Sequence, residues 1–176
     1  TFTPTAADSD KKLYIDFDGA YMNATVYING HELGTRPYGY ISFSYDLTPY
    51  IEWGKPNVVA VRVDNAEQPN SRWYSGCGIY RHVWLRKLDP VHVAQWGTYV
   101  TTPHVTAQEA TFSVQTNVEN TTDEAQTITL QTSLIDADGR VVAVAEPASL
   151  TLDAHAITAT TQSLTLANPR LWSVDA

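Results

Sequence analysis

Apolar and polar residues alternate with a period of two along most of the chain. In "LYIDFD" the residues Leu13, Ile15 and Phe17 share one face, and the same alternation recurs in "YISFSYDL", "NVVAVRVDN" and "IYRHVWLRKL". Side chains of a β-strand point alternately to opposite faces, so each stretch predicts a strand with one buried face. No convincing stretch longer than one turn has the 3.6-residue period of a helix. The pattern therefore predicts an all-β protein.

Turn signals separate these expected strands. In "ATVYINGHELG" the pair Asn29-Gly30 readily takes positive φ angles, which favours a tight hairpin. Asp46 to Tyr50 is expected to form a single helical turn, because a capping residue is followed by Pro49. Asp136 to Gly139 predicts another hairpin turn.

The composition changes at Asp89-Pro90. Tyr, Trp, Gly and Asn are frequent before this point, whereas Thr, Ala, Val and Leu dominate after it. We therefore predict two domains, residues 1–88 and 89–176, with a short connection. The second half holds about seven short strands at sandwich-like spacing, which suits an immunoglobulin-like β-sandwich without the paired cysteines of antibody domains.

Charge and composition exclude several classes of partner. The chain has 11 Lys and Arg against 19 Asp and Glu, a formal net charge of −8, so we expect no binding to nucleic acid. No apolar run approaches the roughly 20 residues that cross a bilayer, so no membrane insertion is expected. The single Cys77 is expected to be a small buried residue in a tight loop, with a reactive thiol as the alternative.

No catalytic centre is expected within this chain. The five histidines are scattered without metal-ligand spacing, so we predict neither a metal site nor a cofactor. A nucleophile elbow and a phosphate-binding loop both need a following helix, which the pattern does not provide. The carboxylate pair Asp16 and Asp18 is interpreted as solvated charge.

The segment "DNAEQPNSRWYSGCGIYR", residues 64–81, concentrates polar and aromatic side chains between two expected strands. Asn70, Ser71 and Arg72 offer hydrogen-bonding groups, and Trp73 and Tyr74 offer flat apolar faces. A sugar ring presents hydroxyls at its edge and C–H groups on its faces, so this mixture suits sugar recognition. The residues alone equally allow the aromatics to close the end of a sandwich.

Five ordered motifs resemble the sugar-binding domain of glycoside hydrolase family 2, which contains β-galactosidases, β-glucuronidases and β-mannosidases. They are Phe17 to Ala20, Val26 to Gly34, Gly39 to Thr48, Asn57 to Asn65 and Gly78 to Leu85. Ala20 replaces the usual Val. The resemblance implies a jelly-roll (galactose-binding-like) β-sandwich, truncated because the family's domain begins with strands that precede this sequence.

The second half is similar to the immunoglobulin-like domain of the same family. "VENTTDEAQTITLQTSLIDADGRVV" and "NPRLWSVDA" carry this resemblance. In the family both catalytic glutamates of a retaining mechanism lie on a (β/α)8 barrel, which this chain does not contain. The resemblance thus implies an inactive fragment of an exo-acting retaining β-glycosidase, a β-galactosidase, whose partner is the barrel of the same polypeptide.

Carried over by position, the resemblance assigns substrate contacts to Asn70, Ser71, Arg72 and, less directly, Trp73. Several relatives have an Asp near Ser71 or Arg72, so the sugar stays open. Two other hypotheses remain: a stand-alone carbohydrate-binding module and a structural two-domain protein. We also expect homo-oligomer formation through unpaired strand edges, and a periplasmic or secreted bacterial enzyme.

Overall fold

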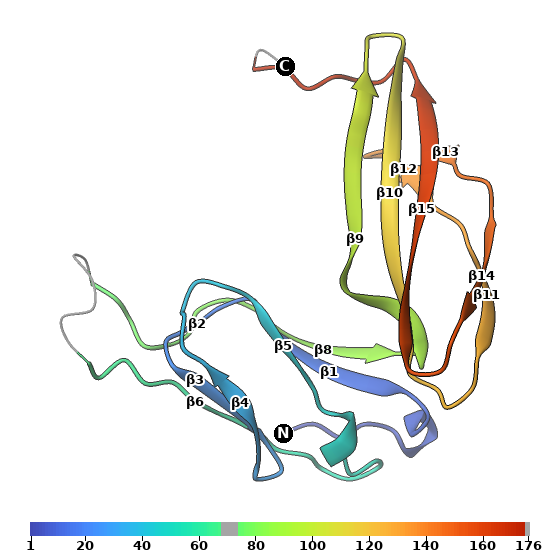
Figure 1. The fold of residues 1–176 in the computed structure, drawn as a ribbon. Coiled ribbons are helices and arrows are strands. Elements are labelled where there is room, and N and C mark those ends of the chain that lie inside the picture. The colour runs from blue at the N-terminus through green and yellow to red at the C-terminus, as the bar shows by residue number, and fades with distance from the viewer. Residues whose placement is uncertain (68–73, 175–176) are drawn as a thin grey trace. The chain divides into compact units, whose positions relative to one another are not determined.

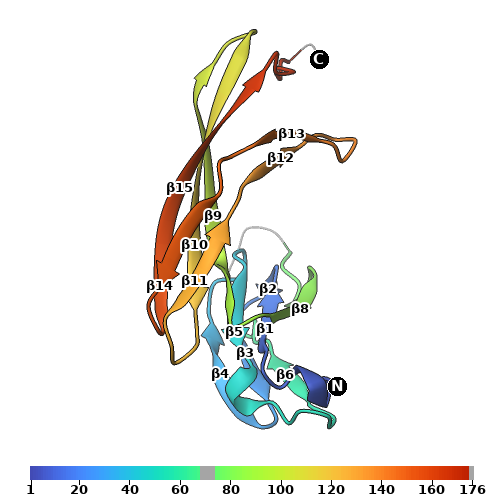
Figure 2. The ribbon, with the colours of Figure 1, turned by 90° about the vertical axis from the view of Figure 1, so that its right-hand side faces the viewer.

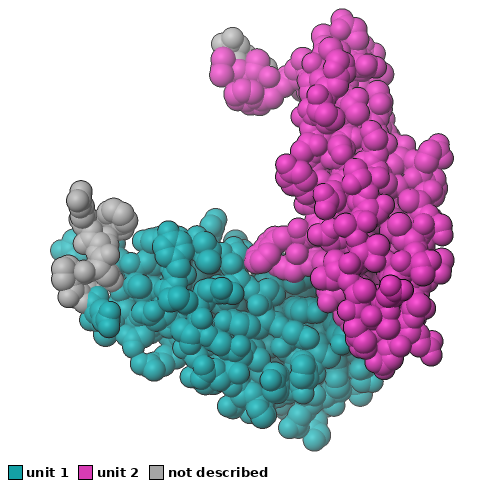
Figure 3. Space-filling view, viewed as in Figure 1, with its two compact units in different colours: residues 1–89 teal, residues 90–176 magenta. Residues whose placement is uncertain are grey.

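Two compact units, residues 1–89 and 90–176, make up the protein (Figures 1 and 3). The computed structural model describes residues 1–67 and 74–174. In both units nearly all regular structure is β-strand, which confirms the predicted fold class. Among the described residues, no helix has the length and apolar character that crossing a membrane requires.

Unit 1 is a β-sandwich of two antiparallel three-stranded sheets. One sheet has the order β5-β1-β8 and the other β4-β3-β6, while β2 and β7 form a short two-stranded sheet. The strands are β1 (Lys12–Phe17), β2 (Ala20–Tyr21), β3 (Ala24–Ile28), β4 (His31–Arg36), β5 (Phe43–Asp46), β6 (Val59–Arg62), β7 (Gly78–Ile79) and β8 (Val83–Leu88). Two 3-10 turns, η1 (Ala6–Asp8) and η2 (Thr48–Tyr50), complete the unit.

The core of unit 1 follows from the alternation in the sequence. Leu13, Ile15 and Phe17 of β1 are buried, and they share one cluster with the buried face of β3. The rings of Phe17 and Phe43 stack with their centroids 4.9 Å apart, which joins β1 to β5. The hydrophobic pattern therefore predicted this core correctly.

The predicted local turns of unit 1 are also present. Asn29 and Gly30 join β3 to β4 with φ angles of 49° and 85°. At η2, Asp46 Oδ1 accepts a hydrogen bond of 2.8 Å from the Thr48 amide, and Pro49 occupies the first turn. Residues that tolerate left-handed φ or pre-set a helical φ thus appear where the chain reverses.

The prediction of a single strand over residues 79–88 is wrong, because this segment is divided between two strands, β7 and β8. β7 pairs with β2 and β8 pairs with β1. Phe17 pairs with Val83, and Ala20 pairs with Ile79. Two residues lie between Phe17 and Ala20, but three lie between Ile79 and Val83. The segment that joins β7 to β8 therefore has one residue more than the segment that joins β1 to β2. An extra residue interrupts a ladder in the manner of a β-bulge. As a result, Tyr80 lies outside both strands.

The inner face of unit 1 is open between β6 and β8. Val83 and Leu85 stand opposite Phe17 and Ile15 in the β1–β8 register, so they share the core-facing side of the sheet. They are nevertheless 42% and 48% exposed. A groove of about 470 Å³ runs along these side chains and the inward valines of β6.

Unit 2 is the second β-sandwich, with long strands in the order β15-β10-β9 and the pairs β11-β14 and β12-β13. Its described strands are β9 (Val91–Val105), β10 (Glu109–Asn120), β11 (Gln126–Leu130), β12 (Ser133–Ile135), β13 (Val141–Val144), β14 (Ala148–Leu152) and β15 (Ala156–Ala167). Val114, Ala145 and Leu164 form the buried centre of its core. Figure 2 shows the β12–β13 hairpin reaching away from the long strands.

One expected strand of unit 2 is also divided. The segment "QTITLQTSLID" alternates like a single strand but forms two, β11 and β12, because the chain changes partner from β14 to β13 between them. Thr132 fixes the change: its hydroxyl lies 2.8 Å from Gln162 Oε1, and its carbonyl accepts a hydrogen bond of 2.8 Å from Ala145. The turn from Asp136 to Gly139 closes the β12–β13 hairpin as predicted, with Gly139 at φ 81°.

Candidate functional site

The loop that follows β6 is held together at its base. The Asp64 amide donates to the Met22 carbonyl at 2.9 Å, which fixes the departing chain. Asn65 Nδ2 lies 3.5 Å from the Ser75 carbonyl and 3.4 Å from that of Gly76, so it links the departing chain to the returning one. The two ends of the loop therefore leave and re-enter the sandwich at one place.

The predicted substrate contacts belong to this loop. Asn70, Ser71, Arg72 and Trp73 lie outside the described residues, so their assignment stays a prediction. The structure describes the chain again from Tyr74, directly after them in the sequence.

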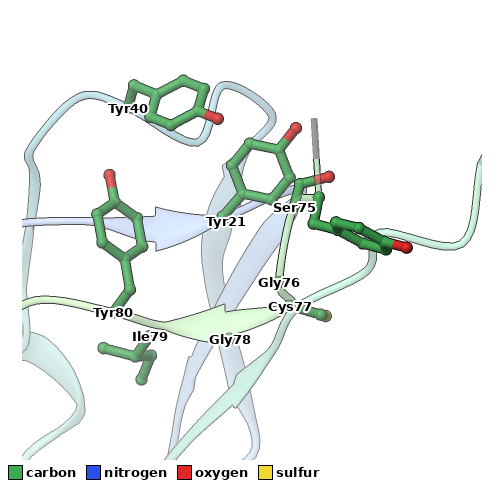
Figure 4. Close-up of a pocket in the computed structure, with 9 residues that line it drawn as sticks. Tyr21, Tyr40, Ser75, Gly76, Cys77, Gly78, Ile79 and Tyr80 are labelled. Carbon is green, nitrogen blue, oxygen red and sulfur yellow. The ribbon is translucent and has the colours of Figure 1, made fainter. Parts of the chain in front are cut away.

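A pocket of about 240 Å³ lies beside the returning chain (Figure 4). Residues 74–80 form one part of its wall, and the rings of Tyr21 and Tyr40 form another. Among these described lining residues there is no charged side chain. The pocket therefore offers aromatic faces and hydroxyl groups, a combination that suits an uncharged ring.

Two glycines allow the tyrosine rings to take their positions. The Tyr80 hydroxyl donates to the Gly39 carbonyl at 2.8 Å, and the Tyr80 ring covers Gly19 so closely that a Cβ there would stand 2.5 Å from ring atom Cζ. The Tyr21 ring covers Gly39 in the same way, with Cγ 2.9 Å from such a Cβ. Any side chain at either glycine would displace a ring of the pocket.

Tyr40 is a half-exposed ring on the loop between β4 and β5. Its centroid lies 5.1 Å from that of Tyr21 at an interplanar angle of 56°, and Tyr38 packs edge-on against it at 5.7 Å. Within the described residues, the hydroxyls of Tyr21 and Tyr40 make no hydrogen bond to the protein, whereas that of Tyr80 is used for Gly39. Two phenol groups are thus available to a ligand.

Cys77 lies on the wall of this pocket. We expected it to be buried, but it is exposed, with Sγ 3.4 Å from the Val63 carbonyl. The prediction was wrong because residue 77 precedes the short edge pairing of β7 with β2 and does not enter the core.

The carboxylates on and after β1 have structural partners. Asp16 forms an ion pair with Arg86, whose Nη2 lies 3.1 Å from Asp16 Oδ1. Asp18 Oδ2 accepts a hydrogen bond of 3.0 Å from Trp84 Nε1 and lies 3.6 Å from His82 Nδ1. In the part of the chain that the structure describes, no group of three or more His, Cys, Asp or Glu is placed to hold a metal ion.

Sequence reasoning missed the tyrosines of the pocket. Tyr21, Tyr40 and Tyr80 come from three separate parts of the chain, and only folding brings them together. The available signal was weak: "RPYGY" places Tyr40 directly after Gly39, and "GAYM" places Tyr21 two residues after Gly19.

Comparison with known proteins extends over nearly the whole chain. The family model described as "Glycosyl hydrolases family 2" matches residues 91–176. A β-galactosidase of Bacteroides ovatus, BoGH2A, is 55% identical over 175 residues, which are 99% of this chain and 20% of that protein. A β-glucuronidase of Formosa agariphila is 34% identical over 190 residues, 94% of this chain and 19% of that protein.

A solved structure of a family 2 glycosyl hydrolase from Bacteroides cellulosilyticus matches with a TM-score of 0.94 and 39% identity. The match covers 99% of this chain and 24% of that one. The chain thus spans about a fifth of the length of these curated relatives. Since sequence and fold agree across both units, the chain belongs to glycosyl hydrolases family 2.

Proposed function

We propose that this chain is a non-catalytic part of a retaining exo-β-glycosidase, specifically a β-galactosidase, and that its loop after β6 binds substrate. The observation that carries the proposal is the pinned base of this loop. Asn65 and Cys77 hold the described ends of the loop beside the tyrosine pocket, whose described lining residues carry no charge. The similarity to BoGH2A, named a β-galactosidase, supports the same activity.

In this proposal the chain orients the sugar and the rest of the polypeptide breaks the bond. A retaining enzyme needs an acid/base carboxyl group and a nucleophilic carboxylate about 5–5.5 Å apart across the glycosidic bond. Asp16 and Asp18 are held by Arg86 and Trp84 on the sandwich, so they support the structure of unit 1. We therefore propose that the isolated 176-residue chain hydrolyses no glycoside.

The relatives are named β-galactosidases or β-glucuronidases, so the identity of the terminal sugar needs an argument of its own. The 55% identity to BoGH2A, named a β-galactosidase, favours galactose as the terminal sugar. Arg72 favours the alternative, a β-glucuronide, because a guanidinium pairs well with a carboxylate.

The test uses the full-length protein and the variant Arg72→Ala. We expect wild type to hydrolyse 4-nitrophenyl β-galactoside faster than the matching β-glucuronide. The variant should lose roughly 10- to 100-fold in kcat/KM, as expected for removal of a charged hydrogen bond. Arg140→Ala is the matched control, since Arg140 is an exposed arginine on the β12–β13 turn. Unchanged hydrolysis of every accepted substrate by Arg72→Ala would show that the loop does not bind the sugar.

A further inference from the structure

We propose that the tyrosine pocket, formed by Tyr21, Tyr40 and residues 74–80, binds the leaving group of the substrate when that group is an uncharged ring. The leaving group is the sugar or aryl ring joined to the terminal residue through the β-linkage. This inference rests on the proposed function and adds the class of substrate that the enzyme prefers. It assigns the preference to residues outside the predicted sugar contacts.

The size of the pocket fits one ring. Its volume of about 240 Å³ lies below the roughly 300–1,000 Å³ of sites that enclose drug-sized ligands. Tyr40 is 51% exposed and Tyr80 is 50% exposed, so part of each ring faces solvent in the absence of a ligand. Covering these surfaces with the apolar face of a sugar or an aryl ring would remove apolar area from water.

The polar groups of the pocket restrict the charge of that ring. Hydroxyls of Tyr21 and Tyr40 make no protein hydrogen bond among the described residues, so they can bind ring hydroxyls. No described lining residue carries a charge that could neutralise a uronate or a sulfate. An anionic ring would lose hydration here without gaining a counter-ion. The described lining of the pocket therefore favours a neutral ring.

The place of the pocket in the chain favours the leaving group, and not the terminal sugar, as its ligand. Tyr74 follows the predicted sugar contacts directly in the sequence, and residues 74–80 continue from there along the pocket wall. Figure 4 shows Tyr21, Tyr40 and Tyr80 around the returning chain. A terminal sugar held by residues 70–73 would thus have its next ring beside these tyrosines.

The experiment compares two substrates in the full-length enzyme. Phenyl β-galactoside has a ring as its leaving group, and methyl β-galactoside has none; if wild type accepts only β-glucuronides, the corresponding glucuronide pair is used. Tyr40→Ala should lower kcat/KM for the phenyl substrate about three- to tenfold, because an aromatic contact is lost. The methyl substrate should be unaffected. Each variant is compared with wild type on the same substrate, which cancels the intrinsic reactivity of the leaving group.

Two further variants separate the contribution of the Tyr40 hydroxyl from that of its ring and test whether the effect is specific to the pocket. Tyr40→Phe should keep the phenyl activity but lose roughly two- to tenfold on a β-galactosyl disaccharide, whose second ring carries hydroxyls. Tyr50→Ala is the control, because Tyr50 is an exposed tyrosine that stacks on His31 and does not line the pocket. Melting temperatures show whether each variant folds.

The outcomes distinguish this inference from the proposed function. Hydrolysis by wild type with equal losses on the phenyl and methyl substrates, or with no loss on either, would overturn the inference and leave the proposed function intact. Failure of wild type to hydrolyse any β-galactoside or β-glucuronide would overturn the proposed function itself.

Discussion

Replacing Tyr80 by Phe removes one hydrogen bond that joins the two sides of the tyrosine pocket. The Tyr80 hydroxyl donates to the Gly39 carbonyl at 2.8 Å, so it links the chain after β7 to the loop that carries Tyr40. The ring itself keeps its place over Gly19. Loss of one such bond costs about 0.5–1.5 kcal/mol, and we expect about 1 kcal/mol because water can reach the freed carbonyl at this half-exposed site.

Hydrogen exchange of the full-length enzyme measures this local loosening. The Tyr80 amide donates to the Gly19 carbonyl at 3.3 Å and the Asn23 amide donates to the Pro37 carbonyl at 3.2 Å, so one amide reports on each side of the pocket. A loss of about 1 kcal/mol should speed their exchange about fivefold when exchange follows local opening.

The matched control is Tyr27→Phe on β3, since the Tyr27 hydroxyl makes no hydrogen bond among the described residues. The control should leave the exchange of both amides unchanged. Equal exchange in wild type and Tyr80→Phe would refute the claim that this hydrogen bond holds the pocket walls together. Faster exchange throughout unit 1 would instead indicate a global loss of stability.

Three other predictions test particular parts of the molecule. Gly39→Ala should displace the Tyr21 ring and selectively lower kcat/KM for phenyl over methyl glycosides in the full-length enzyme; equal kinetics with wild type would contradict the tight packing. The isolated 176-residue chain should dimerise through the open face of unit 1, and Leu85→Lys should weaken this; a monomer at high concentration in light scattering would count against it. Hydrogen bonds to Asp89 and Asp10 raise the pKa of Lys11 from 10.5 to about 12, so its stabilising effect should be complete below pH 10.5 and lost as the pH rises through 12. Alkaline unfolding of Lys11→Met against wild type measures this, and identical curves would refute it.

Much of the fold could be predicted because local chemistry determined it. Alternation in "LYIDFD" identified the buried face of β1, and Asn29-Gly30 identified the hairpin between β3 and β4. Both features depend on residues that are neighbours in the sequence. The strand break after Ile79 depends on one extra residue relative to a distant partner, so no local pattern could indicate it.

The candidate site was only partly predictable for the same reason. The resemblance directed attention to residues 70–73, which lie outside the described residues. Tyr21 and Tyr40 are separated by 19 positions and approach only because Gly39 leaves room for a ring. Cys77 was misjudged because composition suggests burial, while its place before a two-residue edge pairing leaves it exposed.

A crystal structure of the full-length enzyme with an unhydrolysed β-galactosyl disaccharide tests the central claim most directly. We predict that the terminal sugar contacts at least one side chain among residues 70–73 and that the second ring lies against Tyr40. A disaccharide bound in the active site with no atom of Tyr40 or of residues 70–80 within about 4.5 Å would contradict the account.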